Sequence, residues 1–198
     1  VAVAGPDQTI ECTGPEGALV TLDAGGSSDP DDDPLEYAWS GPFGTAAGAS
    51  PTVTVPIGTW TITLTVTDPA GAVATDTVVV TVRDTVAPAL LVRALPDRLW
   101  PPDGRLAQVF VGITTRDLCD PQPVVTLVSI TSDDPRFDPD ADVSGASYGT
   151  ADRVVRLRAK RTGGIGGRLY TLSYTATDQS GNAATATTGV LVTQGQGK

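Results

Sequence analysis

The sequence contains no histidine and no methionine, only two cysteines, and few aromatic residues. Without histidine, a Ser-His-Asp triad, a Cys-His pair and an imidazole zinc site are all excluded. No run of about 18 apolar residues is present, so the sequence predicts no membrane span. Carboxylate chemistry is still open to such a chain, but no insertion that would form a cleft is evident. We therefore predict that the protein is not an enzyme.

Negative charge is concentrated in the first half of the chain. Residues 1–83 carry 11 acidic groups and one basic group, Arg83, whereas residues 84–198 carry 12 of each. The acidic half would repel phosphate, so no nucleic-acid partner is expected. High acidity on a β scaffold indicates either bound cations or a surface that is acidic for solubility.

The residues in abundance are threonine, valine, glycine and proline, a composition typical of β-sandwiches. Residues 60–82 alternate apolar side chains with threonine around a turn at 68–71, which is the pattern of a β-hairpin. The pattern recurs without a gap at 170–192, and 10 of the 23 aligned positions are identical. We therefore predict an all-β chain with two β-sandwich domains in tandem, 1–83 and 84–198, each ending on this hairpin.

Several further elements follow from the alternation. Tyr37 and Trp39 share one face of a strand, and Trp39 is predicted to lie in the core of the first domain. Residues 133–152 are polar and read as a long loop, 163–167 (GGIGG) as a turn, and the last residues as a loose tail. The strands predicted for the second domain are 89–95, 106–115, 124–132 and 154–158, before its hairpin.

An acidic loop in the first domain is a candidate cation site. Asp29, Asp31 and Asp33 alternate, and such carboxylates repel one another unless they are solvated or neutralised by a hard cation, which prefers oxygen ligands. The loop is not an EF-hand, because Pro34 and Ser40 stand where glycine and glutamate are required. The alternative is a turn-forming, solvated acidic loop.

The second domain has a corresponding set of carboxylates, Asp117, Asp120 and Asp178, with Asp84 arriving from the linker. Asp138, Asp140 and Asp142 also alternate, but they lie in the polar stretch and we interpret them as solvated.

Cys12 and Cys119 are the only cysteines, one in each predicted domain. Two lone thiols are unusual in a secreted protein unless they pair. The end of the first strand of such a sandwich runs beside the end of its last strand, so Cys12 is expected near Val82 and the linker. Cys119 is expected at the end of its domain nearest the linker. We predict an interdomain disulfide that locks the two modules in one orientation; the alternative is two buried free cysteines.

Arg156, Arg158 and Lys160 alternate along one predicted strand, and Arg153, Arg161 and Arg168 are close by. We interpret this basic set as a solvated outer face whose charges discourage edge-to-edge pairing. The alternative is a surface that binds an acidic polysaccharide or the acidic neighbouring domain.

Residues 1–83 resemble the PKD domain. The resemblance rests on AGPDQTIEC, on LDAGGSSDPDDDPLEYAWS, and on a closing motif formed by Gly58, Trp60, Ile62, Leu64, Val66, Asp68 and Gly71. It implies an immunoglobulin-like β-sandwich used as an extracellular module in bacterial and archaeal enzymes and surface proteins. It also implies that Asp68 completes a calcium site with Asp29, Asp31 or Asp33, as in calcium-binding PKD domains.

Residues 84–193 resemble bacterial Ig-like domains of the hyalin-repeat kind, on DTVAP, LWPPDGRL, TTRDLCDPQP and the second hairpin. We therefore predict a non-catalytic extracellular or cell-surface spacer or adhesion module, calcium-stabilised and part of a longer secreted protein that supplies its neighbouring domains. The alternative is an accessory module that binds carbohydrate or protein for an attached enzyme. That alternative requires a row of exposed aromatic residues, for which only Trp60 and Trp100 are available.

Overall fold

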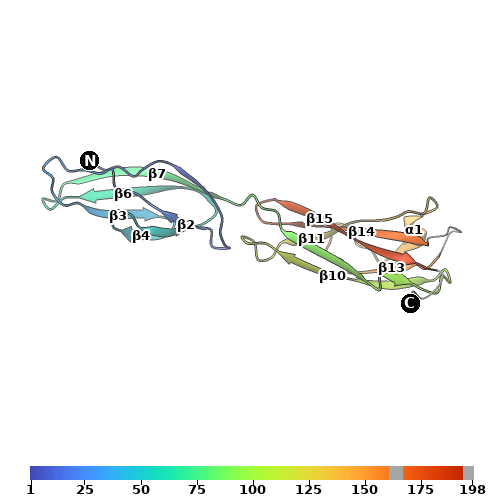
Figure 1. Ribbon diagram of the computed structural model, residues 1–198. Coiled ribbons are helices and arrows are strands. Elements are labelled where there is room, and N and C mark those ends of the chain that lie inside the picture. The colour runs from blue at the N-terminus through green and yellow to red at the C-terminus, as the bar shows by residue number, and fades with distance from the viewer. Residues whose placement is uncertain (161–166, 194–198) are drawn as a thin grey trace. The chain divides into compact units, whose positions relative to one another are not determined.

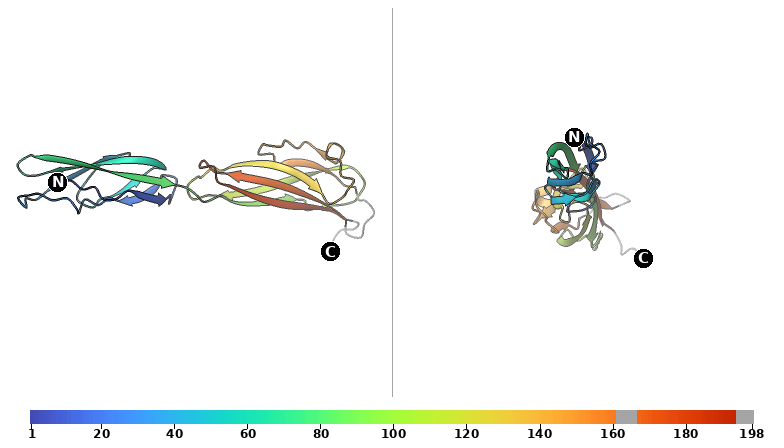
Figure 2. Two further views of the ribbon diagram at one scale, coloured as in Figure 1. Left: turned by 90° about the horizontal axis from the view of Figure 1, so that it is seen from above. Right: turned by 90° about the vertical axis from the view of Figure 1, so that its left-hand side faces the viewer.

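The computed structural model describes residues 1–160 and 167–193. It separates into two compact units, each built of two facing β-sheets (Figures 1 and 2). The first unit contains Val1–Thr85 together with the short segment Leu118–Pro121, and the second contains Val86–Asp117 and Gln122–Lys198. In the described part of the chain, no helix has the length and apolarity to cross a membrane.

The first unit is a sandwich of a five-stranded and a two-stranded sheet. In the larger sheet the order is β1-β7-β6-β3-β4, and the smaller sheet pairs β2 with β5. The bounds are β1 (Gln8–Glu11), β2 (Ala18–Thr21), β3 (Glu36–Gly41), β4 (Gly44–Ala47), β5 (Thr52–Val55), β6 (Gly58–Thr67) and β7 (Val73–Arg83).

The core of the first unit follows from the period-two alternation of its strands. Ile62, Leu64 and Val66 of β6 are buried, whereas the threonines between them are not. Trp39 is 1% exposed, and its indole Nε1 donates a hydrogen bond to the carbonyl of Gly48 at 3.0 Å. The predicted core position of Trp39 and the predicted hairpin are therefore both confirmed, the latter by the antiparallel pairing of β6 with β7.

The first strand closes the first unit by pairing with the last. β1 runs parallel to β7, with Ile10 opposite Val82 and Glu11 opposite Arg83. Two carboxylates hold the segment before it: Asp76 accepts from the backbone N–H of Ala4 at 2.8 Å, and Asp7 accepts from Val79 N–H at 2.9 Å. The end of β1 therefore lies beside the end of β7, as predicted.

The second unit is a sandwich of two four-stranded sheets. Their orders are β12-β13-β10-β8 and β11-β14-β15-β9. The bounds are β8 (Ala89–Leu95), β9 (Arg98–Leu99), β10 (Leu106–Arg116), β11 (Val124–Ser132), α1 (Pro139–Asp142), β12 (Val143–Ser144), β13 (Val154–Arg158), β14 (Arg168–Thr177) and β15 (Ala183–Val192).

The prediction of one long loop at 133–152 is wrong. A short helix, α1, begins after Asp138, whose side chain accepts from Asp140 N–H, and β12 follows and pairs with β13. Proline at the first helical position and the N-terminal aspartate are ordinary helix starts, but four residues leave no periodicity to recognise. Most of the predicted 163–167 turn and the predicted tail lie outside the described residues.

Candidate functional site

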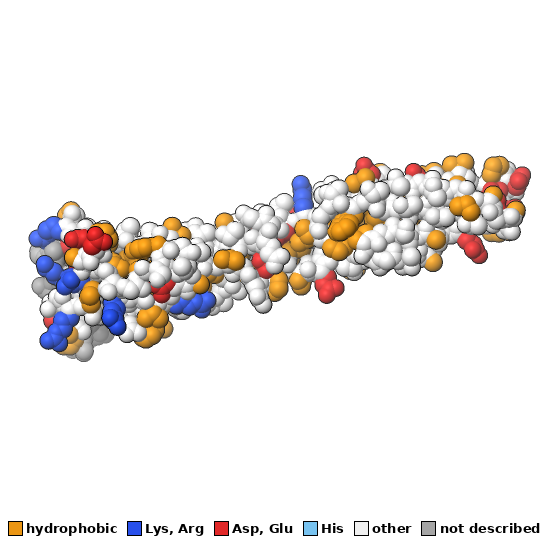
Figure 3. Space-filling view, turned by 180° about the vertical axis from the view of Figure 1, so that it is seen from behind, with side chains coloured by type: hydrophobic (Ala, Val, Ile, Leu, Met, Phe, Trp, Pro, Cys, Tyr) orange, Lys and Arg blue, Asp and Glu red, His pale blue; other side chains and the backbone are white. Residues whose placement is uncertain are grey.

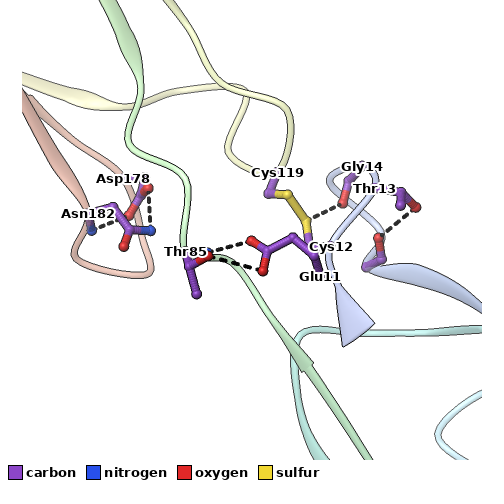
Figure 4. The surroundings of a disulfide bond; sticks show 9 residues. Glu11, Cys12, Thr13, Gly14, Thr85, Cys119, Asp178 and Asn182 are labelled. Atoms are coloured by element: carbon purple, nitrogen blue, oxygen red, sulfur yellow. Dashed lines mark hydrogen bonds between the residues drawn. A yellow bond between two sulfur atoms is a disulfide. The ribbon is translucent and has the colours of Figure 1, made fainter. Parts of the chain in front are cut away.

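The two cysteines form a disulfide, as predicted. Cys12 follows β1, and its bond to Cys119 spans a sequence separation of 107 residues (Figure 4). Both half-cystines are buried, at 3% and 9% exposure, and pack into the hydrophobic core of the first unit. The segment Leu118–Pro121 belongs to that unit by its contacts, although the chain on both sides of it belongs to the second. The segment is thus a covalently fastened part of the first sandwich.

Hydrogen bonds hold the chain on the Cys12 side of the disulfide. Cys12 N–H donates to the carbonyl of Arg83 at 2.8 Å, which extends the β1–β7 ladder by one residue. The two carboxylate oxygens of Glu11 accept from the backbone N–H and the hydroxyl of Thr85, at 2.6 and 3.1 Å (Figure 4). Charge-assisted bonds of this kind are stronger than neutral ones. The position of Cys12 is therefore set by the sheet rather than by the disulfide alone.

In the first unit, two of the predicted calcium ligands lie around one hollow. Asp29 and Asp68 both line a space of about 90 Å³ with Val1, Leu35 and Val66. The acidic loop and the hairpin turn do therefore meet at one end of this sandwich.

The remaining carboxylates of the acidic loop do not complete a ligand set at this hollow. Asp31 and Asp33 are exposed. Among the described residues, no three carboxylate oxygens from Asp29, Asp31, Asp33 and Asp68 lie within 4.8 Å of one another. Asp29 instead accepts from Asp31 N–H at 2.9 Å, the bond of an Asx turn. The arrangement does not fit a preformed cage of carboxylates.

Asp68 and Asp178 each organise a hairpin turn. Asp68 Oδ1 accepts from Ala72 N–H at 2.8 Å. Asp178 Oδ1 accepts from Asn182 N–H at 2.8 Å, and its Oδ2 accepts from the side-chain amide of Asn182 at 2.9 Å (Figure 4). Asp178 is also buried, at 6% exposure. The repeated aspartate is thus explained by the turn it stabilises.

The other carboxylates predicted for the second domain are divided between the units. Asp84 and Asp120 belong to the first unit and are buried, at 8% and 3% exposure. Asp117, at the end of β10, and Asp178 belong to the second. The assignment of these residues as metal ligands stays a prediction.

The most heavily charged buried site is one that the sequence reading missed. Arg168, at the start of β14, is 2% exposed. Its Nη2 contacts Asp142 Oδ2 at 2.6 Å, its Nε lies 3.9 Å from Asp134 Oδ2, and both carboxylates are buried. Nε also donates to Ser132 Oγ at 3.1 Å. The interpretation of Asp142 and Arg168 as solvated groups is therefore wrong.

A second arginine joins this cluster from β13. The Nε of Arg158 lies 3.1 Å from Asp142 Oδ1 and donates to the carbonyl of Ala141, while its Nη1 donates to the carbonyl of Gly104. The guanidinium of Arg168 lies over the ring of Tyr170, with its Cζ 4.5 Å from the ring centroid. Because most of these donors bond within the protein, the cluster joins β13, β14 and α1 rather than presenting a free cationic face.

The cluster alters the proton affinity of its members. Burial alone would raise the pKa of Asp142, but the hydrogen bond and charge of Arg168, with help from Asp138 N–H and Arg158, hold that pKa below its ordinary value. Burial raises the pKa of Tyr170 to about 12. The carboxylate is therefore ionised and Tyr170 is neutral over the physiological pH range.

A polar pocket of about 520 Å³ opens beside the cluster, with Arg136 and Lys160 among its lining residues. Figure 3 shows basic side chains gathered over this end of the second unit. One residue of the buried cluster, Arg168, was within reach of sequence reasoning. Arg168 has the same strand parity as Tyr170, Leu172 and Tyr174, so its alternation places it on the inward face, where a charge requires a partner.

An exposed apolar row crosses the outer face of the β12-β13-β10-β8 sheet. Leu95, Phe110 and Val154 lie opposite one another on three neighbouring strands and are 63%, 53% and 41% exposed. Arg93 and Arg156 lie two residue pairs from this row, on opposite sides of it, and are exposed. Within the described residues neither guanidinium has a hydrogen bond or ion pair. Trp60 and Trp100 are also partly exposed, but they belong to different units.

Each unit consists of two facing, mostly antiparallel sheets, and in the first unit β1 lies beside the last strand, β7. This arrangement defines an all-β protein of immunoglobulin-like sandwiches. More particularly, residues 1–82 match the PKD domain family and carry a PKD domain. No curated protein matches the chain.

Several solved structures are similar to the chain. A nucleoside hydrolase-related hypothetical protein from Saccharophagus degradans associated with carbohydrate metabolism is 32% identical over 39% of this chain and 22% of its own length, with a TM-score of 0.32. This chain thus spans about a fifth of that protein. The fibronectin(III)-like modules of Clostridium thermocellum CbhA are 13% identical over 97% of this chain and 94% of theirs, with a TM-score of 0.35.

A third example is SGBP-B of the Bacteroides ovatus mixed-linkage glucan utilization locus, in complex with a mixed-linkage heptasaccharide. It is 16% identical over 96% of this chain and 43% of its own, with a TM-score of 0.32. These scores are low, so the fold assignment rests on strand order and on the PKD match.

Proposed function

We propose that the chain is a non-catalytic extracellular structural or adhesion module within a longer secreted or cell-surface protein. The observation that carries this proposal is the tandem use of one hairpin in two sandwiches, the first of which is a PKD domain. The buried disulfide supports an oxidising compartment, where such bonds persist. The second unit we assign to the hyalin-repeat kind of bacterial Ig-like domain, with the domains divided as 1–83 and 84–198.

A module exchange in the longer protein tests the structural role. Deleting this chain should impair surface display or activity of the attached domains, and replacing it with two unrelated β-sandwich modules should restore them. Failure of a folded replacement to restore them would contradict a spacer role and would favour specific binding by this chain.

We also propose that calcium stabilises the first unit at the hollow between Asp29 and Asp68. Two carboxylates around one small space offer oxygen ligands, and backbone carbonyls and water would have to supply the others. A cation bound only by the folded state raises the unfolding temperature by mass action.

Thermal unfolding with calcium and with excess chelator tests this point, using the non-reduced protein. We expect a higher unfolding temperature with calcium, and Asp68→Asn should lose the shift while keeping the turn, because its amide oxygen still accepts from Ala72 N–H. Lys160→Gln in the second unit is the matched charge-changing control. Equal unfolding temperatures with and without calcium would remove calcium from the proposal.

A second candidate function is binding of an acidic polysaccharide, favoured by the row of Leu95, Phe110 and Val154 between two exposed arginines. An aromatic ring stacks on a sugar face, and a guanidinium pairs with a carboxylate in a bidentate manner. A uronate-containing polysaccharide should bind the full chain, and a neutral one should not. Phe110→Ala and Arg93→Gln should each weaken that binding, whereas Thr63→Ala in the first unit should not.

A further inference from the structure

The disulfide changes which part of the chain carries tension when the two ends are pulled. Tension follows the covalent backbone, and a cross-link offers a shorter covalent route. The bond between Cys12 and Cys119 closes a loop of the chain with a sequence separation of 107 residues. With the bond intact, the taut route runs through residues 1–12, across the two sulfurs, and on through residues 119–198.

We propose that the disulfide is a tension bypass that shields the PKD domain from unfolding by force. Reduction of the disulfide would then allow the chain between Cys12 and Cys119 to extend. The inference goes beyond the proposed module function and holds for any force applied to the chain ends.

In the first unit the bypass removes force from the hairpin. β2 to β7 lie inside the closed loop, so no tension enters through their backbone. Only β1 remains on the route, and it is pulled at both of its own ends. Without the bond, force would enter at β1 and leave at the end of β7, which are parallel neighbours, and it would shear the ladder between them. With the bond, β1 alone among the strands of the first unit carries tension, and the β1–β7 ladder is no longer sheared.

In the second unit the bypass determines which sheet bears the pulling force. The taut route enters before β11 and leaves after β15. Both strands are antiparallel to β14, which lies between them, so they run in the same direction and are loaded at opposite ends. Force therefore shears two ladders together, while β8, β9 and β10 stay inside the closed loop.

The fully extended lengths of the oxidised and the reduced chain differ by more than a factor of two. A fully extended residue spans about 3.5 Å, so the oxidised chain stretches to about 32 nm and the reduced chain to about 69 nm. A dithiol cleaves the bond by exchange, leaving thiols on Cys12 and Cys119 while its own two sulfurs form a disulfide. Because both half-cystines are buried, we expect this cleavage to be slow in the folded protein.

Single-molecule stretching of the full chain between its ends tests the proposal. The oxidised protein should unfold without a first-unit event and end at about 32 nm. The Cys12→Ser/Cys119→Ser double variant should show one further unfolding event and end at about 69 nm. Wild-type protein reduced with a dithiol and alkylated should end at the same length, and this arm holds even if the double variant does not fold.

An oxidised chain that extends to about 69 nm would overturn the proposal, as would a first-unit event in the oxidised protein. Either result would leave the spacer role untouched, because the module exchange tests that role by a different readout.

Discussion

The two hairpins of this molecule are paired alike and used differently. Gly58 lies opposite Val82 and Thr67 opposite Val73 in the first, and Arg168 lies opposite Val192 and Thr177 opposite Ala183 in the second. The position that is glycine at the start of β6 is a buried arginine at the start of β14.

The side chains along the two hairpins also differ. Trp60 and Leu64 of the first are replaced by the buried tyrosines Tyr170 and Tyr174 of the second. The inward face of the first hairpin thus carries apolar side chains, whereas that of the second also carries ionisable ones. The backbone pattern is shared, so we expect pH and ion pairing to affect the stability of the second unit more than that of the first.

The largest expected effect is alkaline loss of the second unit. Burial raises the pKa of Tyr170 and of Tyr174 to about 12. Folding therefore favours the neutral phenols, and the stability they contribute is present below about pH 10 and is lost as pH rises toward 12, on the order of 2–3 kcal/mol for each.

A pH titration of tyrosinate absorbance together with circular dichroism measures this loss. Tyrosines that ionise near pH 10 without unfolding would contradict the assignment. The Tyr170→Phe/Tyr174→Phe variant is the control: it should have a lower starting stability, because Tyr170 and Tyr174 donate to backbone carbonyls, and a smaller alkaline loss.

Breaking the ion cluster should come next. Arg168→Met removes the buried cation between Asp142 and Asp134 and leaves each with one more exposed arginine, so we expect a loss near the lower end of about 3–5 kcal/mol. Arg156→Met on the exposed face of β13 is the matched control and should change the free energy of unfolding by less than about 0.5 kcal/mol. Denaturant unfolding compares the two. Equal stability of the two variants would show that the cluster does not hold the second unit together.

Acid should weaken the second unit by a smaller amount. The pKa of Asp142 is lower folded than unfolded, so its contribution is present above its ordinary pKa and is lost as pH falls through the lowered value. The free energy of unfolding should therefore fall less in Asp142→Asn than in wild type between about pH 6 and pH 3. A parallel fall in both proteins would assign the acid sensitivity to other carboxylates.

The smallest effect should separate the two turns. Asp178→Ala removes two hydrogen bonds from a buried carboxylate, at about 1–3 kcal/mol, whereas Asp68→Ala removes one from a half-buried carboxylate, at about 0.5–1.5 kcal/mol. The corresponding asparagine variants keep an acceptor and should lose less. Thermal unfolding of the four variants gives the order, and a larger cost at Asp68 than at Asp178 would reverse the comparison.

Much of the fold was predictable because alternation reports burial directly. The strands 89–95, 124–132 and 154–158 have the predicted bounds, and the pairing of Cys12 with Cys119 followed from the neighbouring ends of the first and last strands. The prediction placed Cys119 in the second domain, whereas its segment packs in the first unit, since a tertiary contact of four residues leaves no mark on the local pattern.

The charged cluster was harder to predict for a physical reason. Asp142 and Arg168 are 26 residues apart, and the sequence around either residue does not indicate that the two form a pair. Asp142 lies in an aspartate-rich stretch whose composition is that of a solvated loop, but it is buried at the end of α1 against Arg158 of β13 and Arg168 of β14. Strand parity indicated Arg168 alone. The acidic loop shows the reverse: its composition suggested a cation site, and local Asx bonding accounts for part of it.

The parallel pairing of β1 with β7 also sets an order of events during synthesis. The chain emerges from its N-terminus, so β1 is made first, yet its partner residues Val80 to Arg83 arrive some seventy positions later. Cys119 arrives later still. The first strand must therefore wait unpaired until β7 has been made, and Cys12 cannot bond to Cys119 until all of β8 to β10 has been translated. The strand that is made before all the others of its unit is thus among the last to be fastened.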